Sequence, residues 1–410
     1  MTSVRRRVLV TDAGRGSAIA FIRSLGRRGW AVTAADADRR SPGFRSRYTT
    51  DRLVYPDPRV DADGAVEAIA RAVREREVDL VVPVTDEIGL PLAGARDHFG
   101  PGVNVALPDD DNLAIAHDKR RTLAVAARLG VPVPQTVAVD TADAAVAAVR
   151  GSGLGWPVVV KPQVSREQRE DGTIDAFTVS YAADEAALRS RVEALDGRTG
   201  VLLQRWRPGE GHGIEMLTVA GRPIAAFQHR RLREVPVTGG ASALRESVRL
   251  DPLLYDHACR LLGELRWTGL AMVEFRITPA GPELMEINGR VWGSLPLAVR
   301  SGMDFPARLA DLLLDGPPSA DVPPATEYAT GVRARNLRLE ISWIGAVATG
   351  RRRYPELPWP SRRSAIGAAA SLLDPRIHDD HLVRDDPGPG IALIAGVARE
   401  ALGKVIRRAA

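Results

Sequence analysis

Cysteine is nearly absent from this chain. Its 410 residues include a single cysteine, Cys259, which excludes an intrachain disulfide and leads us to expect a reducing, cytoplasmic location. Long apolar runs are missing too: no stretch approaches the roughly 18–20 apolar residues of a membrane-spanning helix, so we expect no membrane span. The apolar residues 8–10 behind the basic N-terminus are too few for a secretory signal. The sequence contains no internal repeat and no low-complexity array.

The chain also lacks a strong excess of either charge. It has 56 basic and 51 acidic residues, and the basic surplus is spread along its length. This distribution does not favour nucleic-acid binding, whereas phosphate-bearing ligands would suit it. The hydrophobic fraction of 45% is sufficient for extensive cores, and the length fits two or three domains. Residues 391–410 are apolar and then basic; we expect a helix packed on its own domain, with membrane-surface attachment as the alternative.

The first hundred residues have the pattern of an open α/β domain. Strands are predicted at residues 8–11, 31–34, 53–55 and 79–84. A helix between the first two strands predicts a parallel sheet. Part of a dinucleotide-binding fingerprint matches at Gly14, Gly16 and Asp36. The third glycine of the fingerprint is missing, because position 19 is isoleucine. We therefore expect a plain tight turn rather than NAD(P) binding.

A polar segment follows the last of these strands. Thr85, Asp86 and Glu87 stand at the carboxyl end of the strand, where the ligands of open parallel sheets bind. Contact with a small substrate is one interpretation. Capping of the next helix by Thr85 or Asp86 is the commoner role for such residues.

Two acidic segments near position 280 carry the strongest chemical signal. Residues 273–276 and 284–290 have strand character, and residues 279–281 form a turn between them, which predicts a hairpin. Because side chains alternate along a strand, Glu286 and Asn288 share a face, and Glu274 would lie opposite Glu286 on that face.

The oxygen atoms of this hairpin suit a hard metal ion. Two carboxylates and an amide oxygen are ligands that Mg²⁺ accepts, and Mg²⁺ usually keeps waters and shares the phosphates of its substrate. Arg290 follows two residues after Asn288 and adds a fixed positive charge. The constellation indicates a protein that holds a nucleotide triphosphate through metal.

Two lysines stand where they would reach a phosphate. Residues 156–162 form a near-continuous apolar strand that carries Lys161 at its end, where an ammonium group offers a point charge. Residues 108–111 are predicted as a boundary followed by a helix start. Lys119 lies on the helix that runs from there to Leu129, and it would reach the same cleft. Each lysine alone is more often a solvated surface charge. Together with the acidic hairpin, phosphate binding is the better interpretation.

The segment 201–211 is predicted as a strand that leads into a turn. Such a segment offers backbone groups to an adenine ring and a carboxylate to ribose hydroxyls. Glu210 is the candidate for the ribose, and a solvated turn residue is the alternative.

In this order, the pieces resemble the ATP-grasp superfamily, and within it the carboxylate–amine ligases, similar to proteins like the large subunit of carbamoyl phosphate synthetase. The resemblance runs from about Val8 to Leu314. It implies an α/β fold in which an N-terminal open parallel-sheet, Rossmann-like domain (1–108) precedes a two-subdomain α+β ATP-grasp catalytic domain (109–315). A C-terminal extension (316–410) has no assigned role.

The resemblance also implies a role for each matching residue. Contacts with ATP would come from Lys119 and Lys161 at the phosphates, from Gln204, Arg205 and Trp206 beside the adenine, and from Glu210 at the ribose. The remaining roles would be binding of Mg²⁺ or a substituting Mn²⁺ by Glu274, Glu286 and Asn288, and stabilisation of the reacting phosphoryl group by Arg290. The implied reaction converts a carboxylate into an acyl phosphate, from which an amine displaces phosphate. Such chemistry needs positioning and charge neutralisation more than an acid–base group.

The chain departs from the family pattern in its lid, hinge and tail. Many relatives have a glycine-rich lid after the Lys-Pro strand, whereas residues 163–172 contain one glycine and five charges, so Arg166 or Arg169 would have to reach the phosphate. The hinge often has an acidic residue where Arg205 stands. Residues 331–335 are predicted to return as a strand to the catalytic domain. The tail would support a dimer, cover the acceptor site or dock a partner.

An arginine-rich segment offers a site for the acceptor. Residues 228–234 contain three arginines, and the Gly239-Gly240 turn precedes Arg245. Arginine clusters bind planar carboxylates and phosphates, and a glycine turn exposes backbone N–H groups to an anion. We expect the acceptor carboxylate or acyl phosphate here, with Arg230 and Arg245 as catalytic candidates; solvated arginines on a surface strand are the alternative. His229 is a weaker candidate for the base that deprotonates the amine.

The leading hypothesis is an ATP-dependent carboxylate–amine ligase for small-molecule substrates. A bicarbonate-dependent carboxylase of the same fold and a non-catalytic nucleotide-binding regulatory protein are the alternatives. The complete set of candidate metal ligands argues against the second alternative, because a binder has no need of it. The identities of the carboxylate and the amine, and the formation of a homodimer, are left open.

Overall fold

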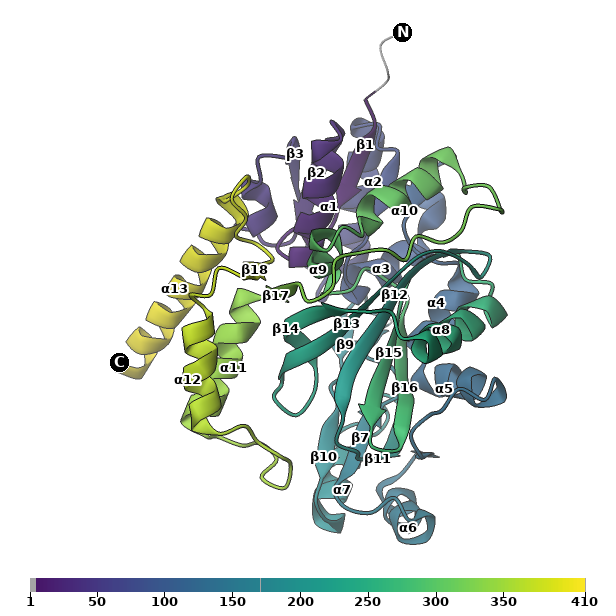
Figure 1. The fold of residues 1–410 in the computed structure, drawn as a ribbon, viewed down its shortest axis with the longest axis vertical. Coiled ribbons are helices and arrows are strands. Elements are labelled where there is room, and N and C mark those ends of the chain that lie inside the picture. Colours follow the sequence, from purple (N-terminus) through teal and green to yellow (C-terminus); the bar gives the residue numbers. More distant parts are fainter. Residues whose placement is uncertain (1–4, 170, 410) are drawn as a thin grey trace.

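The computed structural model describes residues 5–169 and 171–409, and its N-terminal part is an open parallel sheet (Figure 1). The strand order is β3-β2-β1-β4-β5. The strands are β1 (Arg7–Val10), β2 (Ala31–Asp36), β3 (Asp51–Val54), β4 (Leu80–Val82) and β5 (Asn104–Val105). The helices between them are α1 (Gly16–Arg27), α2 (Ala62–Glu75) and α3 (Asp86–Gly94), with the 3-10 turns η1 (Pro42–Arg45) and η2 (Arg96–Phe99). This is the α/β sheet that the sequence predicted.

Both faces of this sheet are buried. Val8 of β1 packs on one face in the same cluster as Phe21 of α1. Leu9 points to the other face and packs with Ile69 of α2. A strand that is apolar on both sides is typical of a parallel sheet covered by helices on both faces.

The glycine turn after β1 is closed by Asp36. Its Oδ2 accepts hydrogen bonds from the Gly14 backbone N–H at 2.7 Å and from the Ser41 hydroxyl at 2.7 Å. The carboxylate that a dinucleotide fingerprint would offer to a ribose is therefore engaged within the turn. The geometry agrees with the tight turn that the missing third glycine favours.

The middle part of the chain contains two larger sheets and a small hairpin. The four-stranded sheet has the order β10-β7-β11-β6 and consists of β6 (Thr136–Val139), β7 (Val158–Pro162), β10 (Ser180–Ala182) and β11 (Val201–Arg205), covered by α6 (Ala142–Ser152) and α7 (Glu185–Glu193). The hairpin, which occupies the lid position, pairs β8 (Arg166–Gln168) with β9 (Ile174–Ala176). This architecture is the two-subdomain arrangement predicted for residues 109–315.

The second sheet is the larger one and has the order β16-β15-β12-β13-β14-β17-β18. Its strands in this part are β12 (Glu210–Val219), β13 (Arg222–Val235), β14 (Ala241–Val248), β15 (Gly269–Thr278) and β16 (Gly281–Asn288). The helices around it are α4 (Asp110–His117), α5 (Lys119–Arg128), α8 (Pro252–Glu264), α9 (Leu295–Arg300) and α10 (Phe305–Asp315). The predicted acidic hairpin is β15 with β16, in which Glu274 pairs with Glu286 as expected.

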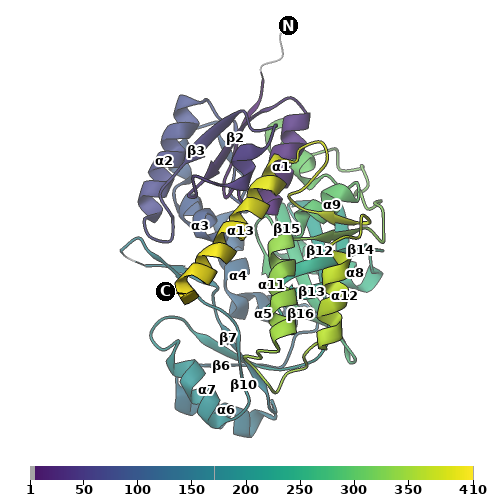
Figure 2. The same ribbon diagram turned by 90° about the vertical axis from the view of Figure 1, so that its left-hand side faces the viewer.

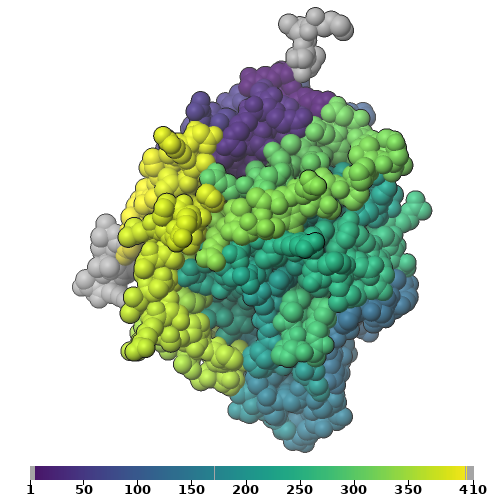
Figure 3. Space-filling model, in the orientation of Figure 1, coloured from purple at the N-terminus to yellow at the C-terminus, as the bar shows by residue number. Residues whose placement is uncertain are grey.

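The tail adds two strands to the larger sheet and lies along one side of the molecule (Figures 2 and 3). The predicted strand is confirmed as β17 (Arg333–Arg335), which pairs with β14, and β18 (Ile377–Asp379) pairs with β17. The helices of the tail are α11 (Leu337–Thr349), α12 (Arg362–Ser371) and α13 (Gly388–Ala409), of which α13 packs against η1. None of the helices in the described ranges, α13 included, is long and apolar enough to cross a membrane.

Buried ion pairs attach the tail to both other parts. Arg23 of α1 lies 2.9 Å from Asp386 Oδ2 and also donates to the backbone carbonyl of His381. Arg245 of β14 pairs with Asp380, and both of these side chains are fully buried. Removing one partner of such a pair costs about 3–5 kcal/mol, because it leaves an uncompensated buried charge. The tail is therefore an integral part of the folded unit.

One helix prediction was wrong. The helix predicted to start after residues 108–111 and to run to Leu129 is two helices, because α4 ends at His117 and α5 begins at Lys119. Asp118 stands between them, and its Oδ1 accepts hydrogen bonds from the backbone N–H groups of Arg120 and Arg121. An aspartate that caps a helix start in this way separates two helices that share one apolar pattern.

Candidate active site

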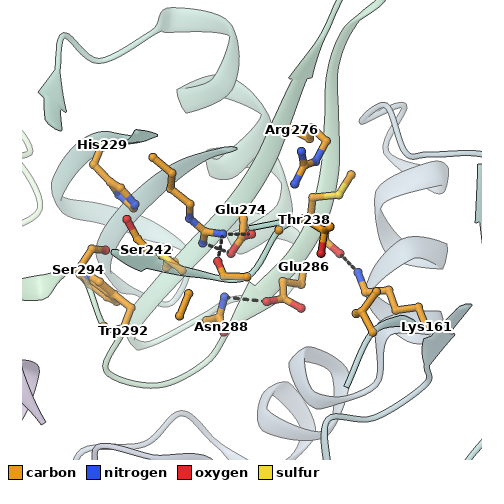
Figure 4. Close-up of a pocket in the computed structure, with 18 of the residues that line it drawn as sticks. Lys161, His229, Thr238, Ser242, Glu274, Arg276, Glu286, Asn288, Trp292 and Ser294 are labelled. Atoms are coloured by element: carbon orange, nitrogen blue, oxygen red, sulfur yellow. Dashed lines mark hydrogen bonds and ion pairs between the residues drawn. The ribbon is translucent and has the colours of Figure 1, made fainter. Parts of the chain in front are cut away.

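A cavity of about 490 Å³ lies between the two sheets of the middle part (Figure 4). Its walls come from β7 and β11, from β13, β15 and β16, and from the starts of α1 and α11. The sequence-predicted residues that line it are Lys161, Gln204, Arg205, Trp206, Glu274, Glu286, Asn288 and Arg290. The predicted residues that do not line it are Lys119, Glu210, Arg230 and Arg245.

The oxygen atoms of the β15–β16 hairpin fit a magnesium site. Glu274 and Glu286 are paired across the two strands, and the Asn288 amide Nδ2 lies 3.4 Å from Glu286 Oε1. The residues that the structure describes include no cluster of three or more His, Cys, Asp or Glu side chains suited to a metal. A metal here would therefore take its remaining ligands from water and from phosphate, as Mg²⁺ does.

The two carboxyl groups experience different surroundings. Burial raises the pKa of Glu274, and the attraction of Arg231 opposes this rise without cancelling it. Burial also acts to raise the pKa of Glu286, but Lys161 and Lys119 outweigh it, so its pKa is lowered overall. Glu286 is therefore the more firmly ionised member of the pair.

Arg231 of β13 is the functional candidate that sequence reasoning missed. Its Nη1 donates to Glu274 Oε1 at 2.7 Å and to the Gly240 carbonyl oxygen at 3.1 Å, and its Nη2 pairs with the second Glu274 oxygen. Its side chain is 9% exposed and lines the cavity. The guanidinium thus touches a candidate metal ligand and the Gly-Gly turn at once.

The two predicted lysines lie beside the acidic hairpin. Lys161 of β7 donates from Nζ to the Met285 carbonyl oxygen at 3.0 Å, and Lys119 donates from Nζ to the Ser165 hydroxyl at 2.7 Å. Burial lowers the pKa of Lys119 to about 8, although Glu286 opposes the shift.

A compositional signal for these lysines was available in the sequence. Of the 56 basic residues in the chain, three are lysines, and two of those are Lys119 and Lys161. A compact ammonium is not interchangeable with a guanidinium at a phosphate site. In a chain that otherwise uses arginine, a lysine is therefore informative.

The side chains of Gln204 and Arg205 in the hinge are hydrogen-bonded to neighbouring segments. Gln204 Nε2 donates to the Thr136 hydroxyl at 3.0 Å, and the Arg205 guanidinium donates to the Gly153 carbonyl oxygen. Glu210, the ribose candidate, lies outside the cavity, where its Oε1 is 2.7 Å from His212 Nε2. A carboxylate that does line the cavity is Glu283, 3.5 Å from the Arg207 Nε.

The acidic segment after β4 pairs with two arginines of the middle part of the chain. Asp86 Oδ1 lies 2.9 Å from Arg290 Nε, and this ion pair raises the pKa of Arg290 despite its burial. Glu87 Oε1 accepts from Arg166 Nε at 2.8 Å. Thr85 occupies the N-cap position of α3 but makes no capping hydrogen bond with its side chain.

The geometry does not favour the predicted substitutes for a glycine-rich lid. Arg166 is held by Glu87, and Arg169 donates from Nε to Asp175 Oδ2 at 2.8 Å within the β8–β9 hairpin. Neither arginine lines the cavity.

The two arginines predicted to contact the acceptor also lie outside the cavity. His229 and Arg231 face the cavity, so Arg230 points to the opposite side of β13, where it donates to Glu246 at 2.9 and 2.6 Å. Arg245 is covered by the tail and pairs with Asp380. The geometry therefore does not favour the catalytic roles predicted for Arg230 and Arg245.

His229 lies at the end of the cavity near Ser294 and Trp292 (Figure 4). Its Nδ1 is 2.9 Å from Glu215 Oε1, which also accepts a hydrogen bond from the Ser294 hydroxyl at 2.7 Å. Gly213 lies opposite on β12, and a Cβ there would stand 2.5 Å from His229 Cε1. The glycine is what leaves room for the imidazole beside a buried carboxylate.

Comparison with known proteins finds a family model that matches part of the chain, and relatives that are similar to it in sequence and fold. A family model described as "ATP-grasp in the biosynthetic pathway with Ter operon" matches residues 198–337. A D-alanine–D-alanine ligase of Mycolicibacterium vanbaalenii is 26% identical over 319 residues, covering 68% of this chain and 81% of the relative. A formate-dependent phosphoribosylglycinamide formyltransferase of the same organism is 26% identical over 201 residues, or 48% of this chain, and the match spans only 46% of that relative's length.

A solved structure shares the arrangement over most of the chain. N5-carboxyaminoimidazole synthetase from Staphylococcus aureus superposes with a TM-score of 0.63 at 13% identity, covering 86% of this chain and 88% of the other. Together with the sequence matches and the order of lysine strand, hinge and acidic hairpin, this defines a class of ATP-binding ligase fold. Residues 198–337 match an ATP-grasp family model, and the chain as a whole is similar to these ligases.

Proposed function

We propose that the protein is an ATP-dependent ligase that converts a small-molecule carboxylate into an acyl phosphate and couples it to an amine, releasing ADP and phosphate. One observation carries this proposal. Lys161, Glu274, Glu286, Asn288 and Arg290, which come from three separate segments, line a single cavity. The D-alanine–D-alanine ligase among the relatives, whose name states such a coupling, supports it.

The phosphate end of the cavity is formed by basic side chains around one carboxylate. Lys161 lines this end and Lys119 lies outside the lining, close enough for its charge to act on Glu286. Both would provide point charges for the phosphates of ATP, and both are largely buried, so their charge is weakly screened. Mg²⁺ held by Glu274, Glu286 and Asn288 would neutralise the charge on the transferring phosphoryl group. Positioning and charge neutralisation are what phosphoryl transfer chiefly requires.

Arg231 and Arg290 stand at the place where the acyl phosphate would form. In the first step, a carboxylate oxygen attacks the γ-phosphorus, the bond to the bridging oxygen breaks, and ADP departs with the electron pair. In the second step, the amine nitrogen attacks the acyl carbon and loses a proton, while phosphate departs with the oxygen that came from the carboxylate. Two guanidinium groups beside this position stabilise the negative charge of both steps.

The decisive experiment follows ADP and phosphate in a matrix of carboxylates and amines with ATP and Mg²⁺. The proposal expects steady release only when one member of each class is present. A carboxylate labelled with ¹⁸O should transfer one labelled oxygen to the released phosphate, because the acyl phosphate intermediate demands it. Release that is stimulated by bicarbonate alone would indicate the carboxylase instead. Tight ATP binding without turnover on any pair would indicate a nucleotide-binding regulator.

A further inference from the structure

A second cavity, of about 230 Å³, adjoins the active-site cavity. Four residues, Val179, Tyr181, Thr238 and Gly239, line both cavities. The Tyr181 hydroxyl donates a hydrogen bond to the Thr238 carbonyl oxygen at 2.9 Å. A single layer of residues therefore separates the two spaces.

The tail supplies the far wall of this second cavity. Trp343 and Ala346 come from α11, and Tyr354 and Trp359 come from the loop between α11 and α12. That loop extends toward β10 in both ribbon views (Figures 1 and 2), and the rings of Tyr181 and Tyr354 meet edge to face at 5.0 Å. The cavity exists because the tail crosses the catalytic part at this position.

The chemistry of the second cavity differs from that of the first. Its lining includes valines, two tryptophans and two tyrosines but no acidic residue, and its arginines, Arg351 and Arg353, are exposed. The volume is below the roughly 300–1,000 Å³ of pockets that hold a whole drug-sized ligand, so it suits one part of a molecule. In the part of the chain that the structure describes, the Tyr354 hydroxyl and the Trp359 Nε1 have no hydrogen-bond partner.

Gly239 stands at the boundary between the cavities. A Cβ at this position would lie 3.5 Å from Arg276 Nη2 on one side and 3.5 Å from the Tyr181 hydroxyl on the other. The glycine, with φ of +126°, leaves a passage that a side chain would narrow. The arginine side of the passage suits a carboxylate, and the tyrosine side leads into the aromatic cavity.

On the basis of the proposed ligase function, we propose that the second cavity receives the aromatic side chain of the carboxylate substrate. The carboxylate lies beside Arg231 and Arg276 in the first cavity, and its side chain passes Gly239 into the second. The substrate class is therefore an arylalkyl carboxylic acid, and the tail is the element that selects it.

Binding of two probes, propionate and 3-phenylpropionate, tests this assignment on the intact protein with ADP and Mg²⁺ present. Calorimetry gives the dissociation constants of the two probes. Burial of one phenyl ring should make 3-phenylpropionate bind at least about tenfold more tightly than propionate. Equal dissociation constants would overturn the proposal.

Two substitutions on α11 form a matched pair for this test. Ala346→Phe fills the second cavity and should abolish the advantage of 3-phenylpropionate over propionate. Ala348→Phe adds the same ring two residues away on an exposed position and should preserve that advantage. An unchanged preference in Ala346→Phe would contradict the proposal, as would an equal loss in both variants.

Turnover separates this inference from the ligase function on which it rests. Suppose that no pair of carboxylate and amine releases ADP, but 3-phenylpropionate binds tightly and Ala346→Phe weakens its binding. The proposed ligase function would then be contradicted, and the proposed role of the second cavity would be supported. If turnover occurs with small polar acids and arylalkyl acids neither bind nor react, the ligase stands and the assignment of the cavity fails.

Discussion

Two strand pairs of the same sheet differ in how well the sequence predicted the positions of their side chains. In the β15–β16 hairpin, Glu274 and Glu286 face each other across a short turn and line the cavity, as the spacing predicted. In the β13–β14 pair, the predicted contacts Arg230 and Arg245 lie outside the cavity, and Arg231 occupies it.

The difference follows from what fixes the register and the orientation of each pair. The turn pairs Thr278 with Gly281, and a one-residue shift of register between Glu274 and Phe275 then brings Glu274 opposite Glu286. Side chains also alternate along β13, but a run of arginines does not show which alternate set of side chains faces the cavity. The tail then covers Arg245 with Asp380 from a distant part of the chain. Three arginines that look alike in sequence thus have three different surroundings.

The largest effect is expected at the hairpin. Glu286→Gln keeps the shape of the side chain but removes the charge that balances Lys119 and Lys161, so it should lose several kcal/mol of transition-state stabilisation, or about 1,000-fold in ADP release. Glu264→Gln, at the exposed end of α8, is the matched control and should retain activity. Circular dichroism checks that both variants are folded. Activity of Glu286→Gln near that of the control would remove the hairpin from the mechanism.

The next largest effect concerns the free energy of unfolding, which should fall more when Arg245 is replaced than when Arg230 is replaced. Arg245→Ala leaves Asp380 buried without its partner and should lower the free energy of unfolding by about 3–5 kcal/mol. Arg230→Ala breaks a pair in which the arginine side chain is 38% exposed, and should cost about 1 kcal/mol or less. Urea unfolding measures both. Similar losses in the two variants would contradict the structural role of Arg245.

The effect on kcat/KM should be large for Arg231 and small for its neighbour Arg230. Arg231→Ala removes the guanidinium that touches Glu274 and the Gly-Gly turn, and should reduce kcat/KM by about 100-fold, the scale seen when one charge-stabilising donor is lost. Arg230→Ala, on the opposite face of β13, should change kcat/KM by no more than a few-fold. If Arg230→Ala were the more damaging substitution, the assignment of the two faces of β13 would be wrong.

The smallest effect is a pH dependence at Lys119. Because burial lowers the pKa of its ammonium to about 8, Lys119 is charged at pH 7 and loses its proton as the pH rises through 8. If the charged form binds the phosphates, the dissociation constant of ATP should rise about tenfold between pH 7 and pH 9. Lys119→Arg stays charged over this range and should flatten the profile. Calorimetric titration at several pH values gives the comparison, and a flat wild-type profile would rule out the role.

The accuracy of the sequence reasoning varied with the range of the interactions involved. The parallel N-terminal sheet, the strand at β17 and the acidic hairpin were predictable, because each depends on local periodicity and short turns. The break between α4 and α5 was missed, because a capping aspartate interrupts an apolar pattern that otherwise continues through it. Glu210 was chosen for its place in the turn, but the side chain that lines the cavity near the hinge is Glu283, from a strand remote in sequence.

The sequence by itself determined the resemblance to the ATP-grasp superfamily and the residue types of the candidate metal and phosphate site. It did so because the residue types of the hairpin and lysine strand, and their spacing, are local properties. Only the tertiary structure decided that Arg231 lines the cavity, that Arg290 pairs with Asp86, and that the tail covers Arg245. These depend on contacts between segments far apart in the chain, whose register is set by packing of whole elements rather than by spacing. The aromatic cavity beside Gly239, built jointly by the catalytic part and the tail, is the clearest example.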